Sequence, residues 1–217
     1  MIKENQKHFN RLHVVIAALV IIVSYLLALV LKFQMPSMLQ ENMGVLPMRI
    51  YLGAMACAVP AYLVLYSIFN LYTPKRVQGR RLELWNIIKA NTVGIAVWLG
   101  VLYLIKMIDF SRHVLLLFYV INIVLEAFVR NLIRYFLRRM RTKGYNLKHI
   151  LLVGYSRAAE EYIDRILANP QWGYKVRGIL DDNIEAGTQY RGVKVLGRIA
   201  NLMVILPENR LDEIAIT

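Results

Sequence analysis

The sequence predicts a four-helix transmembrane bundle followed by an α/β domain with a Rossmann-like parallel sheet. The chain of 217 residues is 58% hydrophobic, and its mean hydropathy of +0.44 is too high for an ordinary soluble domain. Long apolar segments fill most of the chain, whereas short β-type runs alternate with helical patterns after Gly144. We therefore expect a membrane domain at residues 1–143 and a second domain at residues 144–217.

Four apolar segments are long enough to cross a bilayer as helices. They cover residues 12–33, 48–72, 84–108, and a stretch from 112 past 134. The first lacks a small-residue cleavage site and is predicted to be a retained helix, not a signal peptide. Pro60 should kink the second helix. Near the start of the third, Asn86, Lys89 and Asn91 face either lipid headgroups or the bundle interior.

Basic residues indicate the orientation of these helices. Lys and Arg concentrate at the N-terminus, in the predicted loop at 73–83 and between 130 and 148, and are scarce in the other two loops. The positive-inside rule then places both termini in the cytoplasm. The basic stretch at 130–148 should contact anionic lipid headgroups. Because the basic residues flank apolar helices, we do not attribute the net charge of +13 to nucleic-acid binding.

The sequence predicts no catalytic residue and no metal ligand. Cys57 is the single cysteine, which excludes an internal disulfide and a thiolate cluster. The four histidines are scattered without the spacing of metal ligands. The sequence contains no nucleophile paired with a base, no carboxylate pair with metal spacing and no Walker loop.

Ionisable residues near the predicted helices allow two interpretations. Glu126 and Arg130 are four residues apart and can pair on one helix face. Such groups are costly in a membrane span and can mark a functional site. We prefer a structural pair, because no second carboxylate follows in the sequence to form a relay.

Tyr72, Arg76 and Glu83 form either a polar cluster at one membrane face or a solvated loop with one ion pair.

The second domain reads as alternating strands and helices. We predict strands at 149–153, 174–180, 193–196 and 211–216, with helices at 158–167 and 199–206. This order implies a parallel sheet with right-handed crossovers. We also expect the sheet to be incomplete, because no covering helix follows the last strand.

The turn at Gly154 is the candidate nucleotide site, and its weak candidates are Gly154, Ser156, Arg157, Asp181 and Asp182. Ser156 occupies the position where a dinucleotide fingerprint has its second glycine. Helix amides could still hold a phosphate, and Asp181 or Asp182 a ribose hydroxyl. We prefer the alternative, a Rossmann-like fold without cofactor in which the aspartates form the turn, because fold alone does not carry function.

Several short motifs follow one another in a characteristic order. They are Leu71-Tyr72 with Arg76 and Glu83, Phe110-Ser111-Arg112, Gly144-Tyr145-Asn146, Leu151-Leu152-Val153-Gly154, Asn169-Pro170 with Gly173-Tyr174, Gly178-Ile179-Leu180-Asp181-Asp182, and Gly192-Val193 before Leu196-Gly197. The set resembles the N-terminal half of bacterial polyisoprenyl-phosphate hexose-1-phosphate transferases, of the undecaprenyl-phosphate glucose or galactose phosphotransferase type. The resemblance covers the chain from about Leu71 to Thr217.

This resemblance implies a multi-pass protein of the bacterial inner membrane. The family moves a hexose-1-phosphate from a UDP-sugar to undecaprenyl phosphate, releases UMP, and so starts capsule or exopolysaccharide synthesis. Its catalytic domain, which uses Mg²⁺, has no match within residues 1–217, so we expect neither a cofactor nor a catalytic residue here. A homodimer is expected, and nucleic acid is not an expected partner.

Two alternatives stay open. Membrane-anchored nucleotide-sugar dehydratases begin with a similar bundle and Rossmann-like domain. Phe110-Ser111-Arg112 favours the transferases, because the dehydratases tend to have Pro-Arg-Ser at this place. The other alternative is a non-enzymatic membrane protein whose α/β domain senses a ligand or binds a partner.

Overall fold

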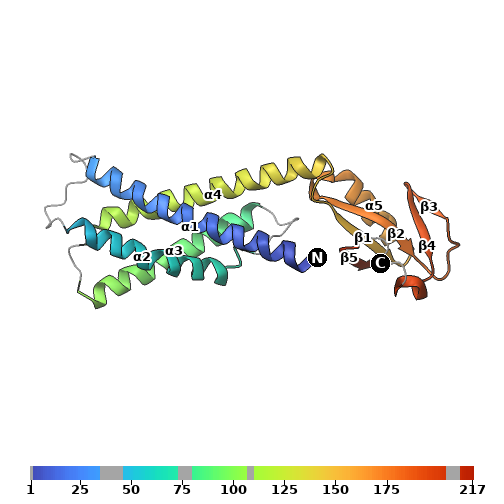
Figure 1. The fold of residues 1–217 in the computed structure, drawn as a ribbon, viewed down its shortest axis with the longest axis horizontal. Coiled ribbons are helices and arrows are strands. Elements are labelled where there is room, and N and C mark those ends of the chain that lie inside the picture. The colour runs from blue at the N-terminus through green and yellow to red at the C-terminus, as the bar shows by residue number, and fades with distance from the viewer. Residues whose placement is uncertain (1, 35–45, 73–79, 107–109, 204–210) are drawn as a thin grey trace. The chain divides into compact units, whose positions relative to one another are not determined.

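The computed structural model describes residues 2–34, 46–72, 80–106, 110–203 and 211–217 (Figure 1). These residues form two compact units, which we call the membrane unit, up to Leu132, and the α/β unit, from Ile133. The division falls inside the fourth helix, so the last turns of that helix belong to the α/β unit. Thr142, where this helix ends, lies next to the domain boundary predicted from the sequence.

Four long helices are apolar enough to cross a membrane, as judged by length and composition. They are α1 (Ile2–Gln34), α2 (Met48–Ile68), α3 (Arg80–Leu104) and α4 (Arg112–Thr142). The candidate span within α1 is Arg11–Gln34. The orientation of the four spans across the membrane stays a prediction.

Four predicted helix ends were wrong, and one of them is the end of α3, which stops at Leu104 and not at residue 108. The polar residues before residue 12 continue α1 back to Ile2, because Lys, Glu and Gln are good helix formers. α2 stops at Ile68 and not at residue 72, because Asn70 adopts a positive φ of 54° and Leu71 N donates to the Tyr66 carbonyl. α3 starts four residues early at Arg80, so that Glu83 lies in its first turn, where a carboxylate is favourable.

Aromatic side chains from all four helices form the core of the membrane unit. The Tyr25 and Trp98 rings stack with centroids 5.9 Å apart, and the Tyr62 and Phe118 rings meet edge-on at 5.3 Å. Small residues allow this packing, and Ala58 of α2 is buried among these rings. A Cβ added to Gly94 of α3 would lie 2.6 Å from Cζ of Tyr62.

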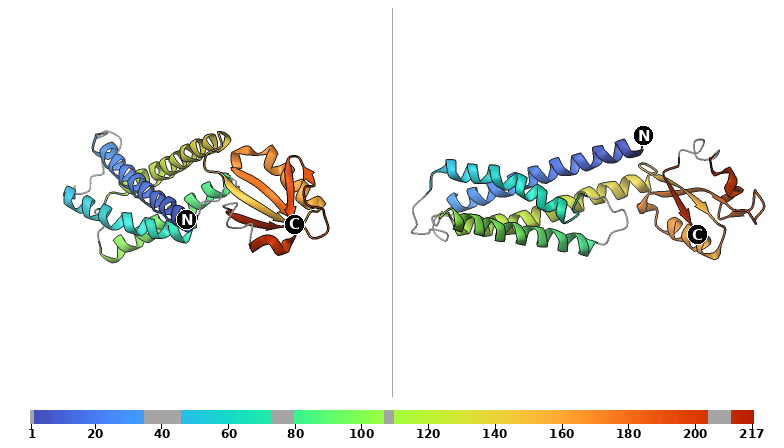
Figure 2. Two further views of the ribbon diagram at one scale, coloured as in Figure 1. Left: turned by 45° about the vertical axis from the view of Figure 1, so that its right-hand side comes forward. Right: turned by 90° about the horizontal axis from the view of Figure 1, so that it is seen from below.

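The α/β unit contains a five-stranded sheet with the strand order β3-β4-β2-β1-β5 (Figure 2). The strands are β1 (Lys148–Val153), β2 (Tyr174–Leu180), β3 (Gln189–Tyr190), β4 (Val193–Gly197) and β5 (Glu213–Ile216). β1, β2, β4 and β5 run parallel, as predicted, but β3 pairs antiparallel with β4. The prediction of a fully parallel sheet was therefore wrong. Arg191 and Gly192, both with positive φ, form the two-residue turn that joins β3 to β4.

One helix, α5 (Arg157–Ala168), covers one face of this sheet. Its Ala159, Ile163 and Ile166 pack against Ile150 and Ile179 of the sheet. On the opposite face Leu151 and Leu180 pack against Leu211. Short 3₁₀ helices occur at Pro170–Trp172 (η1) and Ile199–Asn201 (η2), and η2 stands where we predicted the start of a longer helix. Residues 204–206 of that predicted helix lie outside the described residues.

Candidate functional site

Four residues of the membrane unit form what we call the Arg130 cluster: Leu71, Glu83, Glu126 and Arg130. Nε of Arg130 donates to Oε1 of Glu126 at 2.7 Å, and Nη1 donates to the Leu71 carbonyl at 2.7 Å. Oε1 of Glu83 lies 3.6 Å from the same Nη1. One guanidinium therefore joins the turn after α2, the first turn of α3 and the middle of α4. The planar fork of donors makes arginine suited to such multiple contacts.

The predicted pair of Glu126 and Arg130 is confirmed, and a second carboxylate comes from a residue that precedes the pair in the sequence, which the search for a following carboxylate did not consider. Glu83, distant in sequence, reaches Arg130 from α3. Both partners of the local pair are buried, with side-chain exposures of 2% for Glu126 and 9% for Arg130. Because each charge has a partner, the cluster meets the condition under which buried ions are tolerated.

Tyr72 adjoins the Arg130 cluster. Burial raises the pKa of Tyr72 to about 12, the charge of Glu126 adds to this effect, and Arg130 opposes it. Its Oη is buried and has no hydrogen-bond partner among the described residues. The sequence placed Tyr72 and Glu83 in one possible polar cluster, and both lie near Arg130. Arg76, the third member of that prediction, lies outside the described residues.

A buried amide network on α2, α3 and α4 was missed at the sequence level. Nδ2 of Asn122 donates to Oη of Tyr66 at 2.9 Å and to Oδ1 of Asn91 at 2.7 Å. All three residues are fully buried. The sequence left open whether Asn91 and Lys89 face lipid headgroups or the bundle interior. Asn91 lies in the interior, whereas Lys89 is exposed and lies over the Trp85 ring. Hydrogen bonds between polar side chains hold membrane helices together, which is what this network can do.

In the α/β unit the Gly154 turn joins β1 to α5. Gly154 has a φ of +98°, which favours glycine. The hydroxyl of Ser156 accepts a hydrogen bond from Ala159 N at 3.3 Å and caps α5. Arg157 is 92% exposed and pairs with Glu161 at 3.4 Å. Ser156 is thus engaged by its own helix, and Arg157 extends into solvent.

Asp181 lies directly against this turn. Its Oδ2 accepts from Tyr155 N at 2.7 Å, and its Oδ1 accepts from Asn183 N at 2.7 Å and Ile184 N at 3.0 Å. Asp182 instead accepts from Ile199 N at 2.9 Å, at the start of η2. In a dinucleotide fold the turn amides bind the pyrophosphate. Here a carboxylate of the same chain binds one of those amides, and both aspartates hold backbone turns.

We expect the hydrogen bonds of Asp181 to make the stability of the α/β unit depend on pH. The bond from Tyr155 N, and next that from Asn183 N, lower the pKa of Asp181. A lowered pKa stabilises the fold above the unfolded pKa of about 3.9, and this contribution is lost as the pH falls further. Asp181→Asn should therefore unfold at a lower temperature than the wild type at pH 7.

The measurement is thermal unfolding of both proteins between pH 7 and pH 3. The two melting temperatures should converge in the acid range, because protonated Asp181 resembles asparagine. An Asp182→Asn variant is the control, since the Asp182 carboxylate accepts one backbone hydrogen bond, from Ile199 N at the start of η2. A constant difference between wild type and Asp181→Asn over the whole range would contradict this account.

The comparison with protein families decides the classification. A family described as a CoA-binding domain matches residues 67–217, which is more than half of the chain. The chain belongs to this family. CoA-binding domains of this type occur in the N-terminal region of polyprenyl-phosphate sugar phosphotransferases. No curated protein matches the chain.

The match to the CoA-binding family begins at the end of α2 and includes α3, α4 and the whole α/β unit. All four residues of the Arg130 cluster and the complete Gly154 turn lie inside it. α1 and most of α2 lie outside it. The family therefore combines two helices of the membrane unit with the α/β unit, which agrees with the region from Leu71 onward that the motifs indicated.

Proposed function

We propose that residues 1–217 are the membrane anchor and accessory domain of a sugar-1-phosphate transferase. Its substrates would be a UDP-sugar and undecaprenyl phosphate, and its product would start capsule or exopolysaccharide synthesis. The observation that carries the proposal is the family match over 67–217, since this domain occurs in the N-terminal region of such transferases. Four candidate spans support placement in a membrane. The charge distribution favours cytoplasmic termini, and a bacterial inner membrane is the location that the proposed transferase would have.

In this proposal the chemistry belongs to a separate catalytic domain that holds Mg²⁺. Among the described residues, no group of three or more His, Cys, Asp or Glu side chains could hold a metal ion. The charged groups of the Arg130 cluster are paired with one another. Their role would be to fix three helices together, so that the anchor presents a constant surface to the rest of a homodimeric enzyme.

The test is UMP release. Membranes from cells that express the complete gene should release UMP from UDP-glucose or UDP-galactose only when undecaprenyl phosphate is present. Residues 1–217 alone, purified and given the same substrates and Mg²⁺, should release none. Formation of a 4-keto-6-deoxy sugar by the complete gene product would favour the dehydratase alternative, and inactivity with every UDP-sugar would favour the sensor. UMP release by residues 1–217 would reveal an active site in this chain.

The Gly154 turn gives a second prediction. Because Asp181 binds Tyr155 N, a pyrophosphate would meet a negative charge where it needs a donor. NAD and CoA, which both contain pyrophosphate, should bind with dissociation constants no tighter than about 1 mM. Asp181→Ala frees this amide and should strengthen binding of both.

Titration calorimetry with the wild type, Asp181→Ala and Arg157→Ala distinguishes the two interpretations of the turn. In a working dinucleotide site Asp181 would hold the ribose, so Asp181→Ala would abolish a micromolar affinity for NAD. Binding of UMP that disappears in Arg157→Ala would make the domain a nucleotide sensor. Weak binding in the wild type that improves in Asp181→Ala is the result we expect.

A further inference from the structure

One side of α3 forms an exposed stripe that changes from charged to apolar along the helix. The candidate span Arg80–Leu104 contains the whole stripe. Its members recur every three or four residues, which places them on one side of an α-helix. They are Arg81, Trp85, Lys89, Thr92, Ala96, Leu99 and Tyr103. When α3 crosses a membrane, these side chains face lipid and not the interior of the bundle.

Lys89 is the unusual member of this stripe. Ionisable residues of membrane spans usually face the bundle interior or a water-filled cavity, where they find partners. Lys89 is exposed instead, and it forms no ion pair with another described residue. Thr92, the next member, is satisfied by the Ile88 carbonyl at 2.9 Å and by Oη of Tyr119 at 3.0 Å. Lys89 is therefore the group that needs a partner from outside, and this partner must be an anion.

The ammonium group of Lys89 lies close to the level of Trp85, one helical turn nearer to the start of α3. Side chains of a helix tilt toward its N-terminus, and Nζ of Lys89 lies 5.5 Å from the centroid of the Trp85 ring. Tryptophan is enriched where a membrane meets water, and long basic side chains extend to that layer. The cation thus reaches the depth of the lipid headgroups, with the exposed Arg81 one turn further out.

The four candidate spans offer no second anion for Lys89. They contain two acidic residues, Glu83 and Glu126, and both lie beside Arg130. The spans of a second copy therefore have no further carboxylate to place against Lys89, and two such stripes would repel each other. The phosphate groups of lipids are the anions that a membrane provides at this depth.

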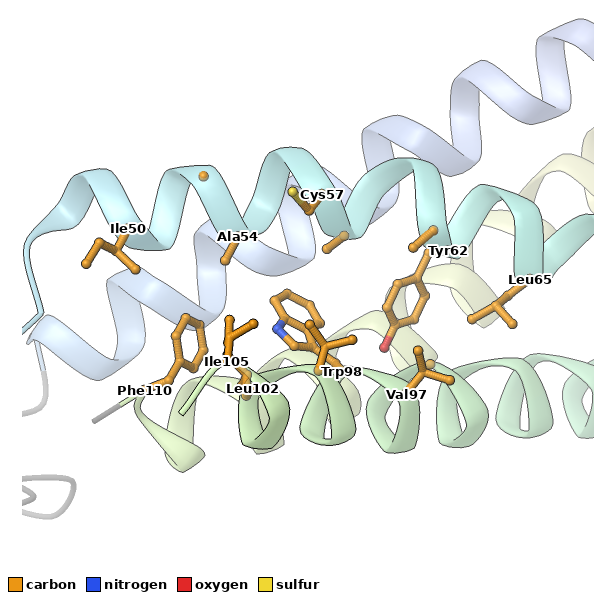
Figure 3. Close-up of a pocket in the computed structure, with 15 residues that line it drawn as sticks. Ile50, Ala54, Cys57, Tyr62, Leu65, Val97, Trp98, Leu102, Ile105 and Phe110 are labelled. Atoms are coloured by element: carbon orange, nitrogen blue, oxygen red, sulfur yellow. The ribbon is translucent and has the colours of Figure 1, made fainter. Parts of the chain in front are cut away.

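The open groove between α2 and α3 differs from this stripe. Val97, Trp98 and Leu102 line its α3 side (Figure 3), and its described lining residues carry no charge. Trp98 follows Lys89 by nine residues, which is two and a half turns and so the opposite side of the helix. A lipid phosphate finds no cation there, and Trp98 can serve as an internal reference for Trp85.

We propose that Arg81, Trp85 and Lys89 bind the phosphate group of an anionic phospholipid. The ammonium of Lys89 donates to the phosphate oxygens, and the lipid's acyl chains lie along the apolar part of the stripe, past Ala96 and Leu99. The site rests on the membrane placement of α3. It is independent of the transferase proposal, because it needs neither a UDP-sugar nor a catalytic domain. It also lies inside a span, apart from the basic stretch at 130–148.

The test uses the full chain in vesicles of equal amounts of phosphatidylcholine and phosphatidylglycerol. Bromine atoms, which quench tryptophan fluorescence, are placed on the acyl chains of one lipid or of the other, so that the membrane composition stays the same. Trp172→Phe in every sample leaves Trp85 and Trp98 as the reporters. We expect stronger quenching when phosphatidylglycerol carries the bromine. Adding Trp85→Phe should make quenching by the two lipids equal, because Trp98 faces no cation.

Three variants test the role of Lys89. Lys89→Met should lower the binding constant of phosphatidylglycerol relative to phosphatidylcholine about fivefold, which corresponds to about 1 kcal/mol for one basic group at the headgroups. Lys89→Arg keeps the charge and should keep the preference. Lys106→Met is the matched control, because it removes the same charge from an exposed position just after the opposite end of α3. The preference should be unchanged in that variant.

Equal quenching of Trp85 by the two brominated lipids would overturn the proposal, as would a wild-type preference in Lys89→Met. So would an equal loss in Lys106→Met, because the net charge of the protein would then set the preference. Loss of the preference when inorganic phosphate replaces chloride at equal ionic strength would assign the site to free phosphate. Protection of Trp85 from both brominated lipids would show that a protein partner covers the stripe.

Discussion

Arg130→Met is expected to destabilise the membrane unit by about 3–5 kcal/mol. The substitution leaves Glu126 buried without its partner, and breaking a buried ion pair from one side has a cost of this size. It also removes the donor to the Leu71 carbonyl and the charge facing Glu83. Unfolding by SDS titration in detergent micelles, followed by tryptophan fluorescence, measures the loss.

Arg139→Met on the same helix is the matched control. It removes the same charge from an exposed position and should change stability by no more than about 0.5 kcal/mol. Adding Glu126→Gln to Arg130→Met should recover part of the loss, because the uncompensated carboxylate is then gone. If the variants at 130 and 139 were equally stable, the Arg130 cluster would contribute nothing to the bundle.

Gly154→Ala should destabilise the α/β unit by about 3 kcal/mol. Two effects add. A left-handed backbone conformation with a φ of +98° costs about 1–2 kcal/mol for a residue with a Cβ. That Cβ would also lie 2.5 Å from the carbonyl oxygen of Thr217, so the end of β5 must move away from β1. Overpacking of this kind costs about 1–3 kcal/mol.

Gly187→Ala separates the two effects. Gly187 has a φ of +99°, but nothing lies within 4 Å of its added Cβ, so only the conformational cost applies. Hydrogen exchange of the β1 and β5 amides, with thermal unfolding of both variants, measures the difference. Equal losses at the two positions would mean that Thr217 moves aside freely and does not hold the turn.

The sequence predicted what depends on local pattern. The length of the apolar segments predicted the four long helices that are candidates to cross a membrane. The β-type runs predicted β1, β2 and β4, because burial of these segments follows from their own residues. Contacts between distant residues could not be predicted in this way. Nothing near Arg130 in the sequence points to Glu83, which the antiparallel return of α3 brings to it. Asp181 was correctly found at the end of β2, but its bond to Tyr155 N depends on the packing of two loops.

Some features carried a local indication that we overlooked. Arg191-Gly192 between Tyr190 and Val193 is a possible two-residue hairpin turn, and would have predicted β3. Asn122, in the middle of an apolar segment, required a buried partner by the same reasoning that we applied to Glu126. Its partners, Tyr66 and Asn91, are polar residues of the two preceding helices.

The Arg130 cluster also constrains the order in which the protein is made. Glu126 and Arg130 both belong to α4, so they can pair as soon as that helix forms. The remaining contacts come from Leu71 and Glu83, which the ribosome delivers earlier. If the candidate spans enter a bilayer in the order of the chain, α2 and α3 are in place before α4 brings its guanidinium. A chain that lacked them would expose this ion pair to lipid, and we expect the cell's quality control to remove it.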